Sequence, residues 1–159
     1  MTTDLQNMNL TVLMGGYSAE REISIRSGNA VADVLESAGA RITRLDTAAR
    51  GWHRDLPIET FAFNLLHGVG GEDGQIQELL ESLGVHYSGS GPLGSALCMD
   101  KAKTKLVWQS LGFPTPDFEI IDPESDLAAV IDRLGPVFVK PISEGSSVGM
   151  SKAHDVSSL

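Results

Sequence analysis

The stretch Leu10-Thr11-Val12-Leu13-Met14-Gly15-Gly16 decides the fold, because an apolar run stops there at a pair of glycines. Gly39 and an alternating polar and apolar run at residues 41–45 follow further along the chain. Between them, apolar residues recur with helical spacing at Ile23, Ala30, Val31, Val34, Leu35 and Ala38. This order predicts a strand, a glycine turn, a helix ended by Gly39 and a second strand. A βαβ unit of this kind has parallel strands joined by a crossover helix.

The same pattern then repeats. Phe61, Phe63 and Leu65 predict a third strand that ends before His67 and Gly68. A helix is predicted next, ended by Gly84, with one apolar face formed by Ile76, Leu79, Leu80 and Leu83. Residues 85–87 predict a fourth strand, and the turn at residues 88–92 leads toward a short helix. Residues 1–97 are therefore predicted to form an open, mostly parallel α/β sheet.

The pattern changes at Cys98. A helix is predicted at residues 102–111, and Pro114 and Pro116 then favour an extended segment. Further elements are predicted in this part of the chain: a strand at 118–121, a helix at 126–134, a strand at 137–139, a second hairpin strand within 148–153, and a capped helical turn at 155–159. Residues 98–159 are thus predicted to be a smaller α+β unit, and we expect the chain to stop where a helix begins.

Composition excludes several classes of function. Twelve basic and 21 acidic residues give a net charge of −9, which argues against nucleic-acid binding because phosphate contacts need a basic surface. Cys98 is the only cysteine, so an internal disulfide is excluded, and we expect a buried, inert thiol. There is neither an apolar run of roughly 18 residues nor a secretory leader pattern, so we expect a cytoplasmic protein without a membrane partner.

The hairpin loop from Lys140 to Gly149 contains the residue types that bind phosphate. Gly145 and Gly149 allow backbone amides to turn toward a ligand, and the sequence adds the hydroxyl groups of Ser146 and Ser147 and the charge of Lys140. A serine and glycine cluster is also an ordinary turn signal. From these residues alone, a phosphate-binding loop and a plain flexible hairpin are equally supported.

Two further loops follow strand ends and should face one crevice, because ligands of open parallel sheets bind beyond the carboxyl ends of the strands. The first, at residues 15–22, lacks the Gly-x-Gly-x-x-Gly spacing of a dinucleotide turn. Its Glu20 suggests a cationic ligand, although the same acid would also suit the dipole of the following helix. Arg21 and Glu22 are predicted to be solvated.

The second loop, residues 67–74, holds four glycines around His67, Glu72 and Asp73. His67 is a candidate to orient a substrate carboxylate, with a partly buried polar group as the alternative. Glu72 and Asp73 are predicted to cap the next helix rather than to bind a metal. Lys101 begins a helix, where a bound anion would explain a positive charge; a solvated lysine is the alternative.

Taken together, five motifs resemble those of the D-alanine:D-alanine ligase family of ATP-grasp enzymes in order and spacing. They cover residues 10 to about 153. The motifs are Gly15-Gly16-x-Ser18-Ala19-Glu20-Arg21-Glu22-x-Ser24, Leu66-His67-Gly68-x-Gly70-Gly71-Glu72-Asp73-Gly74, Tyr87-x-Gly89-Ser90-Gly91, Met99-Asp100-Lys101 and Lys140-Pro141-x-x-Glu144-Gly145-Ser146-Ser147-Val148-Gly149.

The resemblance implies a reaction and a substrate site. ATP phosphorylates the carboxylate of one D-alanine, and the amine of a second D-alanine attacks the acyl phosphate to give a dipeptide for peptidoglycan. By resemblance, Glu20 contacts the ammonium group of the first D-alanine and His67 lies by its carboxylate. Ser146 hydrogen-bonds to Glu20. These three are the candidate catalytic residues.

The resemblance also implies a nucleotide site. Lys101 and Lys140 match lysines that reach the ATP phosphates. Ser147 and the backbone amides from Gly145 through Ser146 to Val148 would form the loop over the γ-phosphate, which we expect to be mobile. An open α/β domain at 1–97 and an incomplete ATP-grasp central domain at 98–159 are the domains that the resemblance predicts.

The resemblance further implies what lies outside the chain. The family's Mg²⁺ or Mn²⁺ ligands are expected downstream of Leu159, so residues 1–159 look like an amino-terminal half that is inactive alone. A homodimer is expected. Two alternatives stay open: a non-catalytic binding or dimerisation module, and a related ATP-grasp enzyme such as a D-alanine:D-lactate ligase.

Overall fold

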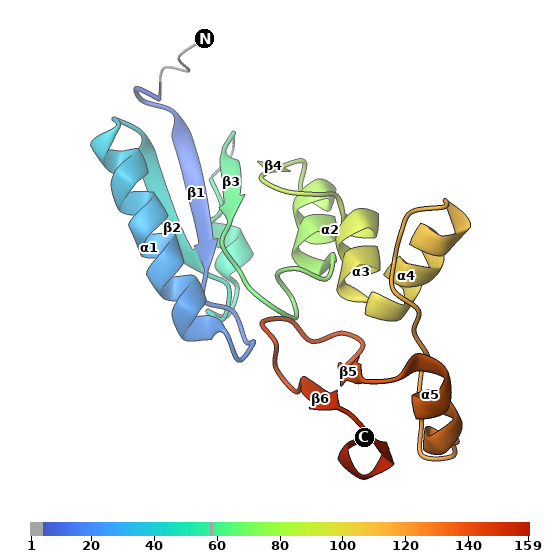
Figure 1. Ribbon diagram of the computed structural model, residues 1–159. Helices are drawn as coiled ribbons and strands as arrows, with labels where there is room; N and C mark the ends of the chain where they lie inside the picture. Colours follow the sequence, from blue (N-terminus) through green and yellow to red (C-terminus); the bar gives the residue numbers. More distant parts are fainter. Residues whose placement is uncertain (1–4, 58) are drawn as a thin grey trace. The chain divides into compact units, whose positions relative to one another are not determined.

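The computed structural model describes residues 5–57 and 59–159. The chain divides into two compact units, Met1–Ala96 and Leu97–Leu159 (Figure 1). Each unit is described by itself below.

In the described part of the first unit, four strands form one parallel sheet in the order β2-β1-β3-β4. They are β1 (Asn9–Met14), β2 (Arg41–Asp46), β3 (Phe61–Asn64) and β4 (His86–Tyr87). The central strand β1 pairs Leu10 with Ile42 on one side and with Phe61 on the other. Strands covered on both faces are apolar throughout, which is why the run that opens the chain forms the centre of the sheet. The predicted open parallel α/β sheet is confirmed.

Helix α1 (Arg21–Ser37) packs on the sheet through small residues rather than through the predicted apolar stripe. Its buried positions are Ser24, Gly28 and Ala32, spaced four residues apart. A Cβ at Gly28 would lie 2.7 Å from the Cβ of Met14, so the helix and β1 are as close as their backbones allow. Val34, one of the apolar residues whose spacing predicted this helix, is 68% exposed. The predicted helix is present, and close packing against β1 favours small residues on its buried face.

Helix α2 (Gln75–Ser82) covers the opposite face of β1, since successive side chains of a strand point to opposite faces. Trp52, from the unpredicted 3₁₀ helix η1 (Trp52–Asp55), packs against this core. Leu83, predicted on the buried face of the helix, is exposed because α2 ends one residue before it. The buried cluster on this face consists of Leu13, Leu45, Ala62, Leu66, Ile76 and Leu80.

The second unit is smaller and less regular. It contains α4 (Lys101–Ser110), α5 (Leu127–Leu134), the antiparallel pair β5 (Val137–Val139) and β6 (Ser151–Ala153), and the 3₁₀ turn η2 (Val156–Ser158). The predicted strand at 118–121 is absent. The described sheet of this unit pairs only β5 with β6, and an extended segment without a partner does not become a strand. At the end, Asp155 accepts a hydrogen bond from the Ser158 amide at 3.0 Å, so the predicted cap is present.

Helix α3 (Pro92–Met99) contains the boundary between the two units. Its Cys98 is exposed, so the predicted buried thiol was wrong. The only buried residue of α3 is Ser95, because this helix is apolar without being enclosed. None of the helices in the described ranges is long and apolar enough to cross a membrane.

Candidate functional site

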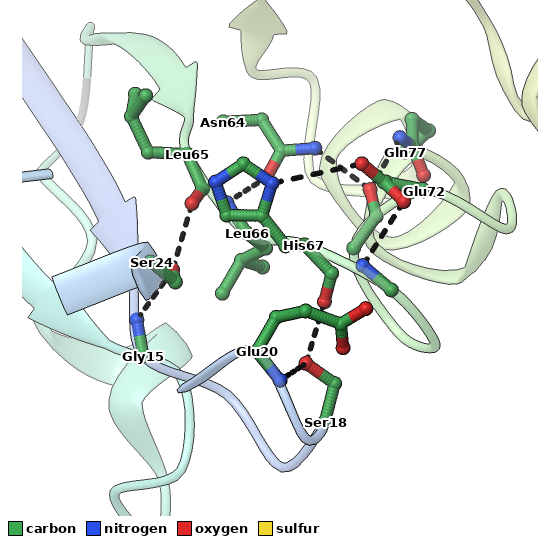
Figure 2. Close-up of polar contacts among 12 residues, drawn as sticks. Gly15, Ser18, Glu20, Ser24, Asn64, Leu65, Leu66, His67, Glu72 and Gln77 are labelled. Atoms are coloured by element: carbon green, nitrogen blue, oxygen red, sulfur yellow. Dashed lines mark hydrogen bonds and ion pairs between the residues drawn. The ribbon is translucent and has the colours of Figure 1, made fainter. Parts of the chain in front are cut away.

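Ser24 fixes the carboxyl ends of two neighbouring strands at the candidate site. Its Oγ donates a hydrogen bond to the Leu65 carbonyl at 2.7 Å and accepts one from the Gly15 amide at 2.9 Å (Figure 2). The side chain is fully buried, so neither bond competes with water. Ser24 therefore joins the chain just after β1 to the chain just after β3.

Ser18 joins the two loops that were expected to share a crevice. Its Oγ donates to the His67 carbonyl at 2.7 Å and accepts from the Glu20 amide at 3.2 Å. The carboxyl-end rule for parallel sheets placed these loops together, and the structure confirms it (Figure 2).

Glu20 carries the most unusual charge in this unit. Its side chain belongs to a residue that is only 9% exposed, and its carboxylate has no hydrogen-bond or ion-pair partner within residues 5–57 and 59–159. It precedes α1 but makes no side-chain cap. The residue is largely enclosed, but its carboxylate oxygens are not among the buried atoms without a partner, so they are open to a cationic ligand.

His67 lies on the adjoining loop. Its Nδ1 is 3.7 Å from Oε1 of Glu72, and its Nε2 is buried without a hydrogen-bond partner in the described structure. The side chain as a whole is about one third exposed. The imidazole thus has one nitrogen beside a carboxylate and one with unused hydrogen-bonding capacity.

The two acids of this loop hold its backbone. Glu72 accepts a hydrogen bond from the Gly68 amide at 3.0 Å, whereas Asp73 accepts from the amides of Gly70 at 2.9 Å and Gln75 at 3.2 Å. Asp73 thus accepts from the first residue of α2, but the N-cap position predicted for an acid is held by Gly74, without a side-chain cap. The prediction for Glu72 was wrong, because the loop turns back and brings the Gly68 amide to its carboxylate.

Two residues that the sequence did not single out anchor the same loop. The side-chain amides of Asn64 and Gln77 each donate to the Gly71 carbonyl at 2.9 Å. Oδ1 of Asn64 also accepts from the Leu66 amide at 3.1 Å. Asn64 could have been found from the sequence, because asparagine at a strand end is a turn signal. The burial of Gln77 could not, because a glutamine within a helix is usually exposed to solvent.

Arg21 was predicted to be solvated, and this was wrong. Its guanidinium forms a two-point ion pair with Asp46, with Nη1 2.8 Å from Oδ1 and Nη2 2.6 Å from Oδ2. The Arg21 guanidinium, helped by the Ala48 and Gly16 amides, lowers the pKa of Asp46 to about 2. Parallel pairing brings the end of β2 beside the first loop, which sequence spacing alone does not reveal.

Lys101 in the second unit contacts the hairpin loop. Its backbone amide donates to the Ile142 carbonyl at 3.0 Å, and its Nζ donates to the Glu144 and Ile142 carbonyls. Asp100 caps α4 through the Lys103 amide at 2.9 Å. Lys101 thus lies beside the proposed phosphate loop, and the residue is not simply solvated.

The hairpin loop leaves several donors available. Lys140, just after β5, is exposed, and its side chain forms no hydrogen bond or ion pair with any residue in the described part of the chain. Ser146 and Ser147 have positive φ angles of 50° and 61°, a conformation rare for residues other than glycine. Within the described ranges the amides of Gly145, Ser146 and Ser147 donate no hydrogen bond, whereas Val148 donates to Gly145 at 3.0 Å. Consecutive unpaired amides of this kind form an anion-binding concavity.

The candidate residues therefore fall into two groups. Ser18, Glu20 and His67 are joined in the first unit, while Lys101 contacts the loop of Ser146, Ser147 and Val148 in the second. A hydrogen bond between Glu20 and Ser146 would join the two units and stays a prediction. The described residues contain no cluster of three or more His, Cys, Asp or Glu side chains that could hold a metal ion.

Comparison with known proteins gives one consistent result. The family model described as D-ala D-ala ligase C-terminus matches residues 107–159. D-alanine–D-alanine ligase B of Pseudomonas putida is 50% identical over 153 residues, which cover 94% of this chain and 48% of that protein. The crystal structure of the D-alanine–D-alanine ligase of Bacillus anthracis is 38% identical, with a TM-score of 0.81, over 93% of this chain and 50% of that one. A complex of the B. anthracis enzyme with ATP has a TM-score of 0.81 at 37% identity.

A parallel α/β sheet followed by an α+β unit, matched by these structures, is the fold of the ATP-grasp ligases. Over 94% of its length the chain is similar to D-alanine–D-alanine ligases, so the resemblance read from the five motifs is confirmed. The chain spans about half the length of the curated relatives that it matches.

Proposed function

We propose that the chain forms the first D-alanine site and part of the ATP-phosphate site of a D-alanine:D-alanine ligase. In this reaction ATP phosphorylates the carboxylate of one D-alanine, and the amine of a second attacks the acyl phosphate and releases phosphate. The dipeptide serves peptidoglycan synthesis. The names of the relatives at about 50% identity support the assignment.

The observation that carries the proposal is the unpaired carboxylate of Glu20. An ammonium group satisfies such a carboxylate with both charge and hydrogen bonds. His67, on the loop that Ser18 ties to Glu20, has an unused ring nitrogen for the carboxylate of the same amino acid. A zwitterion suits the chemistry of this pair, because Glu20 accepts hydrogen bonds and His67 can donate one.

The second unit supplies the residues that we propose bind the ATP phosphates. Lys140 and the unpaired amides of Gly145, Ser146 and Ser147 provide one cation and three donors for phosphate oxygens. Ser146 is further proposed to hydrogen-bond to Glu20, as the resemblance implies. Residues 1–97 then form the substrate-binding domain, and 98–159 form part of the ATP-grasp central domain.

Mg²⁺ or Mn²⁺, which the resemblance implies, would neutralise the transferred phosphates when bound. The described residues offer no carboxylate cluster for it, so the proposal assigns no metal ligand within this chain. A cytoplasmic location remains an expectation from the sequence pattern, and a homodimer remains one that rests on the resemblance. So does inactivity of residues 1–159 by themselves.

Calorimetric titration of the 159-residue chain with D-alanine tests the proposal. We expect weak binding that Glu20→Gln removes, because the neutral amide cannot pair with the ammonium group. Glu22→Gln is the matched control, since Glu22 is an exposed acid two residues away and should leave binding unchanged. D-alanine binding that is the same in the wild type and in Glu20→Gln would contradict the assignment of Glu20.

A non-catalytic dimerisation module is favoured by one observation: α1 exposes Ile23 and Val34. Analytical ultracentrifugation distinguishes this dimerisation module from the proposed ligase. A dimer that dissociates in Val34→Asp, in a chain that binds neither D-alanine nor ATP, would favour it over the ligase.

A further inference from the structure

We infer that Asn64 and Gln77 are positioning residues for His67, acting through the carbonyl oxygen of Gly71. The inference rests on the proposed function only in giving His67 a substrate to orient. Neither side chain is assigned contact with the substrate.

The two amides hold the loop on both sides of the histidine. Asn64 accepts a hydrogen bond from the Leu66 amide and donates one to the Gly71 carbonyl, so one side chain fixes the residue before His67 and the residue four after it. Gln77 reaches the same carbonyl from the first turn of α2. Asn64 is the last residue of β3 and Gln77 lies on α2, and Figure 2 shows the two side chains.

Gly71 brings the two sides of the loop into direct contact. A Cβ at this position would lie 2.4 Å from the Cβ of Leu66 and 2.9 Å from the Leu66 carbonyl carbon. The loop therefore packs on the residue that precedes His67. A displacement of Gly71 would be passed directly to the backbone of His67.

The imidazole depends on this backbone for its position. Its Nε2 has no partner in the described structure, and its Nδ1 has only the 3.7 Å contact to Glu72, which exceeds an ordinary hydrogen-bond length. The ring therefore has no hydrogen bond of its own to fix its position. The loop that carries it is held by the hydrogen bonds of Asn64 and Gln77.

Gln77 is also a poor choice for stability alone. It is 4% exposed, and its Oε1 has no hydrogen-bond partner among the described residues. Burying an unsatisfied carbonyl carries a desolvation cost that an apolar side chain of similar shape avoids. The benefit of glutamine at this position is its hydrogen bond to Gly71.

The test is Gln77→Met, which keeps the shape of the side chain and removes both polar atoms. We expect the midpoint of thermal unfolding to stay close to wild type, because the lost hydrogen bond is offset by removal of the unsatisfied oxygen. We expect amide exchange of Gly71 and Glu72, whose amides bond to the Gly68 carbonyl, to become about tenfold faster. The His67 ring signal in NMR spectra should shift, and His67→Gln identifies it among the four histidines.

A second variant and a control keep the test independent of folding. Asn64→Asp retains the acceptor for Leu66 and replaces the donor to Gly71 with a carboxylate, so it should move the same signals further. Thr60→Val is the control. It removes the buried hydroxyl pair with Thr11, 2.9 Å apart at the opposite end of the strands, so it should lower stability and leave the His67 signal in place.

The outcomes separate the two proposals. Faster exchange and a shifted His67 signal in Gln77→Met, absent from Thr60→Val, support the positioning role even if D-alanine does not bind. If D-alanine binds, its affinity should fall about fivefold in Gln77→Met, less than a full tenfold loss. Unchanged exchange and an unchanged His67 signal in Gln77→Met overturn the inference, whereas absence of D-alanine binding in the wild type counts only against the proposed function.

Discussion

Glu20 and Gly68 are so close that a side chain on Gly68 would displace the carboxylate. A Cβ at Gly68 would lie 2.6 Å from Oε2 of Glu20, and Gly68 has a φ of 68°. Gly68 follows His67 directly. Its lack of a side chain therefore lets the loop of His67 come close to the carboxylate of Glu20.

Gly68→Ala should both destabilise the chain and disturb Glu20. The left-handed backbone costs about 1–2 kcal/mol for a residue with a Cβ, and the new methyl group must also push the carboxylate away. Gly70→Ala is the matched control, because Gly70 has a φ of 86° but no atom within 4 Å of a built Cβ. In urea unfolding, both variants should lose a similar amount of free energy of unfolding, because both positions have a positive φ. In calorimetry, only Gly68→Ala should lose D-alanine binding. Equal binding in the two variants would contradict the importance of this contact.

Ser24→Ala should be costly although it removes a single oxygen atom. The change leaves the buried Gly15 amide and Leu65 carbonyl without their partner, at about 1–3 kcal/mol. Ser37→Ala on the same helix removes an exposed hydroxyl bonded to the Asp33 carbonyl and should change stability by less than about 0.5 kcal/mol. Unfolding in urea measures both. If the two variants unfold at the same urea concentration, the bridge between the strand ends has no energetic role.

The low pKa of Asp46 predicts that the free energy of unfolding falls at acidic pH. Its folded pKa of about 2 lies below the ordinary value of 3.8, so the ionised form stabilises the fold. This contribution is fully present above about pH 4 and is lost as the pH falls toward 2. Because both side chains of the pair are 36% exposed, solvent screening limits it to about 1 kcal/mol.

Asp46→Asn tests this contribution. Urea unfolding at pH 7 should show a loss of about 1 kcal/mol relative to wild type, and the difference should shrink as the pH approaches 2. High salt should reduce it as well, because the pair is partly exposed. A difference of constant size from pH 7 to pH 2 would show that the ion pair with Arg21 is not its source.

Lys140→Ala should weaken the binding of ATP or inorganic triphosphate. Lys140 has no competing partner in the described structure, so its charge is available to phosphate oxygens, and its loss should lower affinity about tenfold. Lys152→Ala on the adjacent strand β6 removes an exposed lysine and serves as the control. Fluorescence competition at low and moderate salt provides the measurement. Equal weakening in both variants would indicate general charge attraction rather than a site.

The loop beyond Lys140 was predicted to be mobile, and this stays a prediction. The contacts of Lys101 with the Ile142 and Glu144 carbonyls hold only the first part of the loop. Backbone relaxation by NMR should therefore show greater motion from Ser146 to Gly149 than at Ile142. Greater backbone motion at Ile142 than from Ser146 to Gly149 would contradict the prediction.

Sequence patterns were most reliable where a local rule applied. The apolar run at Leu10 to Met14, the glycines that end helices and the loops at strand ends all gave correct elements, because each depends on a few neighbouring residues. Burial was harder to predict: Val34 on α1 is exposed although its spacing is helical, and Cys98 on α3 is exposed although a buried thiol was expected. Helical periodicity shows that a face is apolar, but it does not show whether another element covers that face.

The sequence by itself determined the parallel sheet, the loops of Glu20 and His67, and the relationship to D-alanine–D-alanine ligases, because spacing and motif order are properties of the chain. Only the tertiary structure decided that Ser24 and Ser18 join those loops, that Arg21 pairs with Asp46, and that Asn64 and Gln77 hold Gly71. These contacts join residues that lie 6 to 49 positions apart in the sequence. The physical reason is that a hydrogen bond depends on distance in space, which no local pattern encodes.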